Sequence, residues 1–266
     1  MEITYYYNII SAVCAFIAGA CAGSFINATA MRTVAEKKWW GAERSVCDSC
    51  GHVLESADLF PIASYIALGG KCRYCGSKIK PRHFAAEMIS GAVTAALFLR
   101  WGIGAAFGVS LLVFWFALFN SLTDFESGYI YDVWAISPGA VGLLIRLFGG
   151  WHAVLDGILG GTLGFGFIAL IILLSRGGMG WGDALLMLGI GACVGLKYCA
   201  FGLYIGFMVG GVVVVPLTII KKLKRKDAVP LGPFLAVGSV AALFVGNSLI
   251  RYFGDLIGYN PGWPWW

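Results

Sequence analysis

The chain reads Ser121-Leu-Thr-Asp-Phe-Glu-Ser-Gly-Tyr-Ile-Tyr-Asp132 at one point and Gly178-Met-Gly-Trp-Gly-Asp183 at another. In each stretch an aspartate, Asp124 or Asp183, stands where a long apolar run meets a short polar loop. An ionisable side chain beside a run of membrane-spanning length is costly, so its presence is by default a hypothesis of function. The two stretches therefore predict helices that cross a membrane, and they mark Asp124 and Asp183 as candidate catalytic residues.

Composition indicates a polytopic membrane protein. Hydrophobic residues make up 59% of the 266 positions and charged residues 12%, whereas charged residues are about 25% of an average soluble domain. The net charge of +5 comes from basic residues that cluster in loops between apolar runs. That distribution favours orientation in a bilayer over a nucleic-acid surface. We expect the lipid bilayer as a partner and no nucleic acid, and the sequence leaves the oligomeric state open.

At about 20 residues for each span, the apolar runs predict an all-α protein with about eight transmembrane helices. They lie near residues 8–31, 84–100, 102–122, 133–149, 153–175, 183–196, 198–220 and 231–250. An even number of spans puts both termini on one side. Of the 19 Lys and Arg residues, 15 fall on the side of the first loop and 4 on the other. Basic residues favour the cytoplasm, so we expect a cytoplasmic first loop and both termini outside the cytoplasm.

Four cysteines form two CxxC pairs in the first loop, Cys47-Asp-Ser-Cys50 and Cys72-Arg-Tyr-Cys75. Two such pairs can close a tetrahedral thiolate cage around zinc, which would fold a loop too small to bury its own core. The spacing also admits an iron–sulfur or redox site, or two disulfides, although disulfides are rare in a reducing cytosol. We predict that Cys47, Cys50, Cys72 and Cys75 bind a structural zinc ion.

Two carboxyl groups within hydrogen-bonding range share one proton, because both cannot ionise easily. One then acts as a base on water while the other polarises a carbonyl, which is sufficient to hydrolyse a peptide bond. Gly180 and Gly182 precede Asp183 and would let the backbone turn and admit a substrate strand, so we predict that they shape the site. The structural alternatives stay open: Asp183 as the cap of a helix and Asp124 as a solvated loop charge.

Five ordered segments and the two CxxC pairs resemble the type IV prepilin peptidases, a family of membrane aspartic proteases with a GxGD signature. The segments are Gly23–Asn27, Cys47–Cys75, Asp124–Asp132, Gly178–Asp183 and Val229–Phe234, and they are spread over nearly the whole chain. The chain departs from the family pattern at Leu185, where many members carry lysine, and at Tyr131, where proline is frequent.

The resemblance implies a bifunctional enzyme of the bacterial cytoplasmic (inner) membrane. Such enzymes cut the basic leader from type IV prepilins or pseudopilins, after a glycine on the cytoplasmic side, and thereby serve pilus or secretion systems. Members with the zinc loop usually also methylate the new N-terminus with S-adenosylmethionine, whose contacts in this chain we do not assign. The chain would comprise a first transmembrane helix (1–31), a cytoplasmic zinc-binding loop domain (32–83) and a seven-helix membrane aspartic protease domain (84–266).

Two hypotheses from other classes compete with this one. A proton- or cation-coupled transporter would also carry acids within the membrane, but it would be expected to place them at mid-bilayer depth or in matching halves. A non-catalytic scaffold could present the zinc loop to a partner, although it leaves the contexts of Asp124 and Asp183 unexplained.

Overall fold

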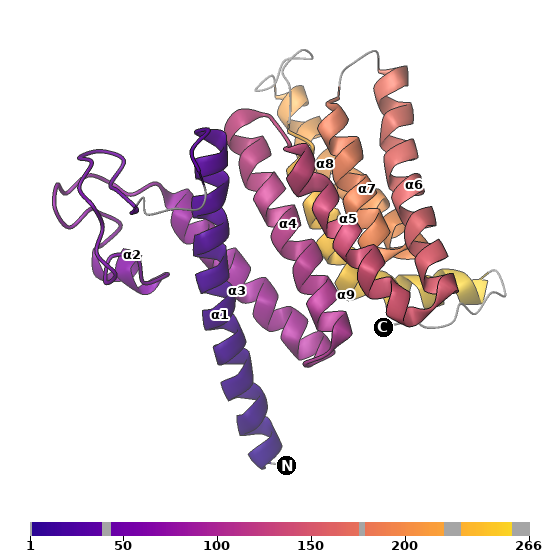
Figure 1. The fold of residues 1–266 in the computed structure, drawn as a ribbon, viewed down its shortest axis with the longest axis horizontal. Helices are drawn as coiled ribbons and strands as arrows, with labels where there is room; N and C mark the ends of the chain where they lie inside the picture. The colour runs from indigo at the N-terminus through magenta and orange to yellow at the C-terminus, as the bar shows by residue number, and fades with distance from the viewer. Residues whose placement is uncertain (1, 39–43, 176–178, 221–229, 257–266) are drawn as a thin grey trace. The chain divides into compact units, whose positions relative to one another are not determined.

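The computed structural model describes residues 2–38, 44–175, 179–220 and 230–256. Almost all of this part of the chain is helical (Figure 1), with two isolated β-bridges in the first loop. The helices are α1 (Glu2–Val34), α2 (Ala63–Ala67), α3 (Pro81–Trp101), α4 (Ala105–Ser127), α5 (Asp132–Arg146), the 3₁₀ turn η1 (Leu147–Gly149), α6 (Trp151–Leu174), α7 (Trp181–Val194), α8 (Leu196–Ile219) and α9 (Gly232–Leu256). They form two compact units, Met1–Ile103 and Gly104–Trp266.

In the first unit α1 and α3 lie side by side, and the loop with α2 connects them (Figure 1). Small residues set the spacing of the two helices. A Cβ atom at Gly19 would lie 2.6 Å from Cβ of Thr94, and one at Gly23 would lie 2.5 Å from Cβ of Ser90. The Ser90 hydroxyl donates a hydrogen bond of 2.7 Å to the carbonyl oxygen of Gly19. The helices therefore pack backbone to backbone, as membrane helices with small residues at their contact do.

In the second unit α7 is the most enclosed helix. Ten of its 14 residues are buried, and it packs against α4, α5, α6, α8 and α9. Close backbone approach makes this possible, because a Cβ atom at Gly139 of α5 would lie 2.9 Å from Cα of Gly189, and one at Gly160 of α6 would collide with the carbonyl of Gly191. The unit is thus built around α7, the helix that carries Asp183.

The eight predicted membrane helices all correspond to helices, but the count of eight spans is not confirmed. Six helices are long and apolar enough to cross a bilayer within the described residues, namely α1, α3, α4, α5 with η1, α6 and α8. The apolar helices Trp181–Val194 and Gly232–Gly246 are shorter. At 14 residues α7 is about 21 Å long, less than the roughly 30 Å of a hydrocarbon core.

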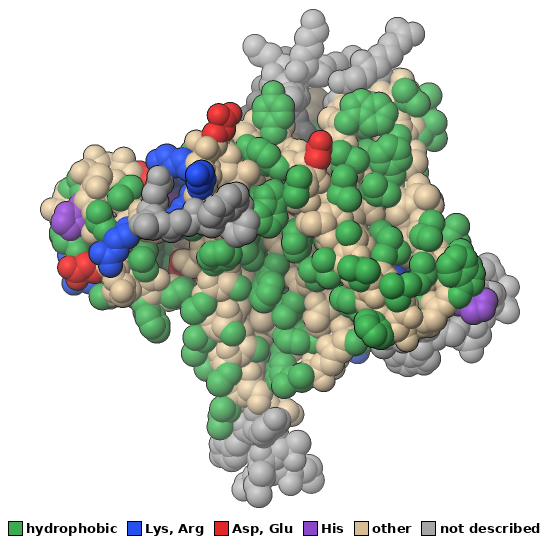
Figure 2. All heavy atoms as spheres, viewed as in Figure 1, with side chains coloured by type: hydrophobic (Ala, Val, Ile, Leu, Met, Phe, Trp, Pro, Cys, Tyr) green, Lys and Arg blue, Asp and Glu red, His purple; other side chains and the backbone are tan. Residues whose placement is uncertain are grey.

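Large apolar side chains lie on the outside of the helices, where a soluble protein would carry charges. Leu173 is 68% exposed and Val212 is 70% exposed. Figure 2 shows hydrophobic side chains over much of the visible face, with few charged groups among those of the second unit. Such a surface suits lipid rather than water. The protein is therefore an all-α, multi-pass membrane protein.

The buried side chain of Arg146 connects the ends of four helices in the second unit by hydrogen bonds. Arg146 is fully buried. Its Nε donates to the carbonyl of Cys193 (3.1 Å), and its Nη1 donates to the carbonyl of Ala153 (2.8 Å) and to Oδ2 of Asp156 (2.9 Å). The other carboxylate oxygen of Asp156 accepts the N–H of Leu196 (3.1 Å). Because the charge is paired and hydrogen-bonded, its burial is tolerated.

Gly160→Ala tests whether close backbone contact holds α7 in place. The added methyl group would meet backbone atoms of Gly191 and Gly195, which cannot rotate away. We expect a loss of about 1–3 kcal/mol of stability, measured as a lower thermal unfolding midpoint of the protein in detergent.

Gly166→Ala is the matched control on the same helix, because its Cβ atom would meet open space. We expect it to be neutral or to stabilise the helix by up to about 1 kcal/mol. Equal midpoints for the two variants would show that close packing at Gly160 is unimportant.

Candidate active site and metal centre

The two CxxC pairs fold into two similar turns. In the first, the N–H of Cys47 donates to the carbonyl of His52 (2.9 Å), and the N–H of Gly51 donates back to the carbonyl of Cys47 (2.9 Å). The second repeats the pattern, with Cys72 bonded to Ser77 (2.8 Å) and Gly76 bonded to Cys72 (2.9 Å). Gly51 and Gly76 both have φ of +69°, a conformation that glycine adopts without strain. Each pair thus points two sulfur atoms to the same side of a tight turn.

The four sulfur atoms of Cys47, Cys50, Cys72 and Cys75 lie within 4.8 Å of one another. All eight cysteines are free thiols. The Sγ atoms of Cys47 and Cys75 are 3.9 Å apart, close to the roughly 3.8 Å expected for two thiolates on one tetrahedral zinc ion. The cluster therefore fits a metal ion, and its sulfur-only donor set suits zinc or iron.

The pKa of the Cys47 thiol is lowered, which favours metal binding. Hydrogen bonds from the backbone N–H groups of Cys50 and Ser49 lower the pKa of Cys47 to about 6. This cysteine is therefore mostly a thiolate at neutral pH, and the thiolate is the form that binds metal.

A polar network braces the loop that joins the two turns. Asp58 accepts hydrogen bonds from Nε of Arg73 (2.8 Å), the hydroxyl of Tyr74 (3.2 Å) and the N–H of Glu55 (3.2 Å). Burial acts in the opposite direction, but these bonds together lower the pKa of Asp58. Arg73 and Tyr74 lie between the cysteines of the second pair. Their hydrogen bonds to Asp58 therefore connect the loop to the candidate metal centre.

Cys50→Ser tests the metal centre. We expect wild-type protein to carry about one zinc ion per chain and the variant to lose it, because a neutral hydroxyl binds zinc poorly. Elemental analysis would measure the metal. Limited proteolysis would show faster cleavage within residues 44–80 of the variant, since the loop has little core of its own.

The control is Cys14→Ser, which alters an exposed cysteine of α1 and should leave the metal content unchanged. Wild-type protein without bound metal, or equal metal loss in both variants, would contradict the assignment.

Asp124 lies in the last turn of α4. The helix is followed by Gly128, whose left-handed backbone (φ +70°) lets its N–H donate a hydrogen bond to the carbonyl of Asp124 (2.8 Å). The residue is 6% exposed, and its Oδ2 accepts a hydrogen bond from the N–H of Gly232 at the start of α9 (3.0 Å). Asp124 is therefore a buried, oriented carboxyl group and not a solvated loop charge.

Asp183 lies in the first turn of α7 and is 7% exposed. The helix is capped at Gly180 without a side-chain hydrogen bond, so Asp183 does not serve as the cap. Its Oδ1 is buried and has no hydrogen-bond partner in the described part of the chain. A buried acceptor without a partner is costly and points to a missing ligand or water.

The structure brings Asp124 and Asp183 together. They lie at the ends of α4 and α7, which pack against each other. Ile130 contacts both Gly182, which precedes Asp183, and Gly232, which is hydrogen-bonded to Asp124. Two acids in one buried place can share a proton and activate a water molecule. The chemistry that this arrangement supports is acid–base hydrolysis.

The glycines before Asp183 act differently from one another. A Cβ atom at Gly182 would lie 2.8 Å from Cβ of Ile130, so only glycine permits this contact. A Cβ atom at Gly180 would lie 4.0 Å from Oδ2 of Asp183, an ordinary contact distance. Gly182 therefore sets how closely α7 approaches residue 130, whereas a Cβ atom at Gly180 would be accommodated, and the predicted site-shaping role of Gly180 stays a prediction. Gly178 lies outside the described residues.

Sequence reasoning did not identify two residues at this site. Gly232 donates to Asp124, and a Cβ atom there would lie 2.7 Å from Oδ2 of Asp124. Ile130 fills the space between Gly182 and Gly232. The segment Val229–Phe234 stands out in the sequence only by its resemblance to the family, because no local pattern reveals a hydrogen-bond partner 108 residues away.

Comparisons with known proteins bear on both units. The model of the bacterial peptidase A24 N-terminal domain matches residues 17–101. The model of the type IV leader peptidase family matches residues 111–215, which include Asp124 and Asp183. No solved structure matches the chain.

Several relatives share the name prepilin leader peptidase/N-methyltransferase. One from Burkholderia pseudomallei is 30% identical over 90% of this chain and 87% of its own length. One from Bacillus subtilis is 29% identical over 80% of this chain and 86% of its own. One from Pseudomonas aeruginosa is 25% identical over 93% of this chain and 95% of its own length. The similarity thus spans most of each chain.

Proposed function

The chain belongs to the type IV leader peptidase family, and on that premise we propose that it cleaves the leader from prepilins or pseudopilins with an aspartate pair. The observation that carries the proposal is the burial of Asp124 and Asp183 near one another, with Oδ1 of Asp183 left without a partner among the described residues. Neither a transporter nor a scaffold accounts for this arrangement in a chain of this family.

In the proposed mechanism the two carboxyl groups hold one proton between them. The ionised carboxylate takes a proton from water as the water oxygen attacks the scissile carbonyl carbon. The protonated carboxyl group donates its proton to the carbonyl oxygen. The C–N bond then breaks, and the new amine leaves with a proton from the pair. The N–H of Gly232 holds Asp124 in a fixed orientation throughout.

We place the aspartate pair on the cytoplasmic side of the bacterial inner membrane. The support is the charge bias of 15 Lys and Arg against 4 between the two sides of an eight-span chain. In that topology α7 and α9 complete the bundle within the second unit, and both termini lie outside the cytoplasm. The substrate would lie with its apolar stem in the bilayer and its leader inside the cell.

The second activity in the relatives' name leads us to propose that the chain also methylates the new N-terminus. S-adenosylmethionine would supply the methyl group. Zinc would be held by Cys47, Cys50, Cys72 and Cys75 and would fold the loop that contains them. The residues that would contact the methyl donor stay unassigned.

Asp124→Asn and Asp183→Asn test the aspartate mechanism. Each change keeps the shape of the side chain but removes the acid, so we expect each to reduce leader cleavage by at least about a hundredfold. The measurement is mass spectrometry of a prepilin substrate incubated with purified protein, with and without S-adenosylmethionine.

Glu126→Gln is the control, because it removes an exposed acid two residues from Asp124 and should leave cleavage unchanged. Normal cleavage by either aspartate variant would eliminate the mechanism. Cleavage without methylation in wild-type protein would eliminate only the second activity.

A further inference from the structure

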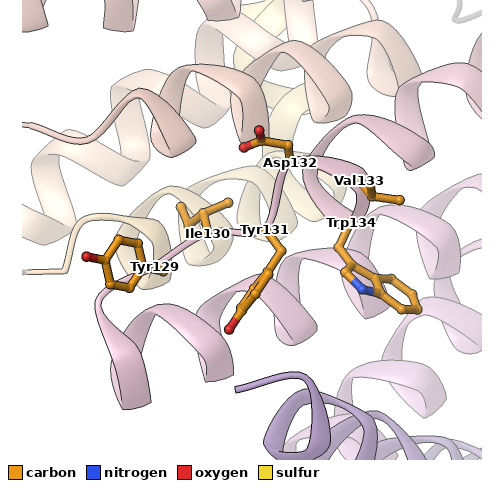
Figure 3. A pocket seen from close by; sticks show the side chains of 6 residues that line it. All are labelled: Tyr129, Ile130, Tyr131, Asp132, Val133 and Trp134. Carbon is orange, nitrogen blue, oxygen red and sulfur yellow. The ribbon is translucent and has the colours of Figure 1, made fainter. Parts of the chain in front are cut away.

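Apolar side chains are exposed in two segments that connect spanning helices. One segment joins α4 to α5, where Figure 3 shows the side chains of Ile130 and Tyr131 before the helix begins. It borders the aspartate pair through Ile130, so it belongs to the site already described. The other segment is residues 59–70 of the first loop, in which Phe60 is 61% exposed and Ile66 is 65% exposed. The metal centre and the aspartate pair do not account for these exposed side chains.

This second segment is an uncharged run inside a charged loop. It reads Leu59-Phe-Pro-Ile-Ala-Ser-Tyr-Ile-Ala-Leu-Gly-Gly70, with Asp58 directly before it and Lys71 directly after it. An apolar run of about 10–14 residues is too short to span a bilayer and is typical of a buried core or of an interfacial segment. A buried core does not describe it, because α2 (Ala63–Ala67), which forms its middle, has no buried residue.

The segment lies beside the first two turns of α3. The ring of Tyr65 stacks on that of Phe84, with 4.8 Å between the ring centroids, and the N–H of Ile62 donates to Oε2 of Glu87 (2.8 Å). At 21 residues α3 is about 32 Å long, so it needs its whole length to cross a hydrocarbon core of about 30 Å. Glu87 is about 9 Å along the helix from Pro81. The segment therefore lies at the depth of the bilayer and not above it.

Backbone N–H groups of this segment form hydrogen bonds within the protein. Those of Ile66, Leu68 and Gly70 donate to carbonyl groups of the segment itself, and that of Ile62 donates to Glu87. A segment in contact with lipid must satisfy its polar backbone groups in this way, since acyl chains offer no hydrogen bonds. The carboxyl group of Glu87 gains a partner by the same contact, as an ionisable group inside a spanning helix requires.

Positive charges follow the segment directly. Lys71 and Lys78 are paired across an isolated β-bridge in the second cysteine turn, and both are exposed. The N–H of Lys71 donates to the carbonyl of Leu68 (3.2 Å), which connects this turn to the end of α2. Like charges placed opposite each other repel, and anionic phospholipid headgroups would offset that repulsion.

We propose that residues 59–70 are an interfacial anchor, which inserts Phe60 and Ile66 among the acyl chains of the leaflet where α3 begins. Lys71 and Lys78 contact the anionic headgroups of that leaflet. Interfacial segments lie about 5–10 Å deep, at the boundary of headgroups and acyl chains, which matches a position beside the first two turns of α3. The anchor holds the metal centre at the membrane surface. It goes beyond the proposed peptidase and methylation activities and does not depend on either.

The test uses the full-length, unmodified protein in lipid nanodiscs. The nanodiscs contain a phospholipid with a photoactivatable diazirine group on the part of its acyl chain nearest the headgroup. After illumination, peptide mass spectrometry locates the lipid adducts. We expect adducts on residues 59–70, with a yield at least roughly tenfold higher than on residues 46–53, because burial of a large apolar side chain favours lipid by about that factor.

Residues 46–53 are the matched comparison within the same loop. Val46 and Val53 are also exposed, at 47% and 41%, but Asp48 between them pairs with Lys80 (3.5 Å), before α3 begins. Equal yields on the two segments would overturn the inference, because lipid would then contact the loop without selection. An absence of adducts on residues 59–70 would also overturn it, because water or protein would then cover Phe60 and Ile66.

Variants test the side chains themselves. The double change Phe60→Ser and Ile66→Ser should lower the yield on residues 59–70 by at least roughly fivefold, while Val53→Ser should leave it unchanged. The yield on residues 9–17 of α1, where Ile10 and Ile17 are exposed, serves as the internal reference in each sample. An undiminished yield in the double variant would contradict insertion of these two side chains.

Membrane charge tests the two lysines. We expect the yield on residues 59–70 to be roughly fivefold higher in nanodiscs that contain phosphatidylglycerol than in phosphatidylcholine alone. Changing Lys71→Gln and Lys78→Gln together should reduce that difference. Equal wild-type yields in the two membranes would overturn the headgroup contact.

Discussion

The enclosure of α7 is the constraint on which the second unit depends. A helix that carries a carboxyl group can lie at membrane depth only where protein, rather than lipid, surrounds that group. The five neighbouring helices provide this surrounding, and they come close because glycines replace side chains at the contacts, as at Gly139 against Gly189 and Gly160 against Gly191. The position of Asp183 is therefore a consequence of backbone contacts along the whole helix.

The same packing places the buried carboxyl group of Asp183 at the start of a short helix. At 14 residues α7 is shorter than a bilayer is thick, and it packs against α4. Asp124 at the end of α4 is held by the N–H of Gly232, which opens α9. Three chain segments thus meet at one place, and each contributes either a carboxyl group or the hydrogen bond that orients one.

The other end of the unit is fixed by a different interaction. Arg146 is buried and bonds to carbonyl groups of Cys193 and Ala153 and to Asp156, so the turns between α5 and α6 and between α7 and α8 are held together. A charged anchor at one end and an aspartate pair at the other leave α7 little freedom to slide. Oδ1 of Asp183, which has no hydrogen-bond partner among the described residues, is tolerated because the surrounding helices are held in place by contacts elsewhere.

The sequence by itself determined the class of protein, the eight helices and the four-cysteine centre. Each of these depends on local spacing: an apolar run forms a helix because its own backbone satisfies its hydrogen bonds, and a CxxC turn presents two sulfur atoms wherever it occurs. The tertiary structure alone decided that α7 is shorter than a bilayer span, that Gly232 orients Asp124, and that Ile130 fits against Gly182. These contacts join residues far apart in the chain. They also depend on glycines, which have no side chain and therefore add no periodic pattern of apolar residues to the sequence.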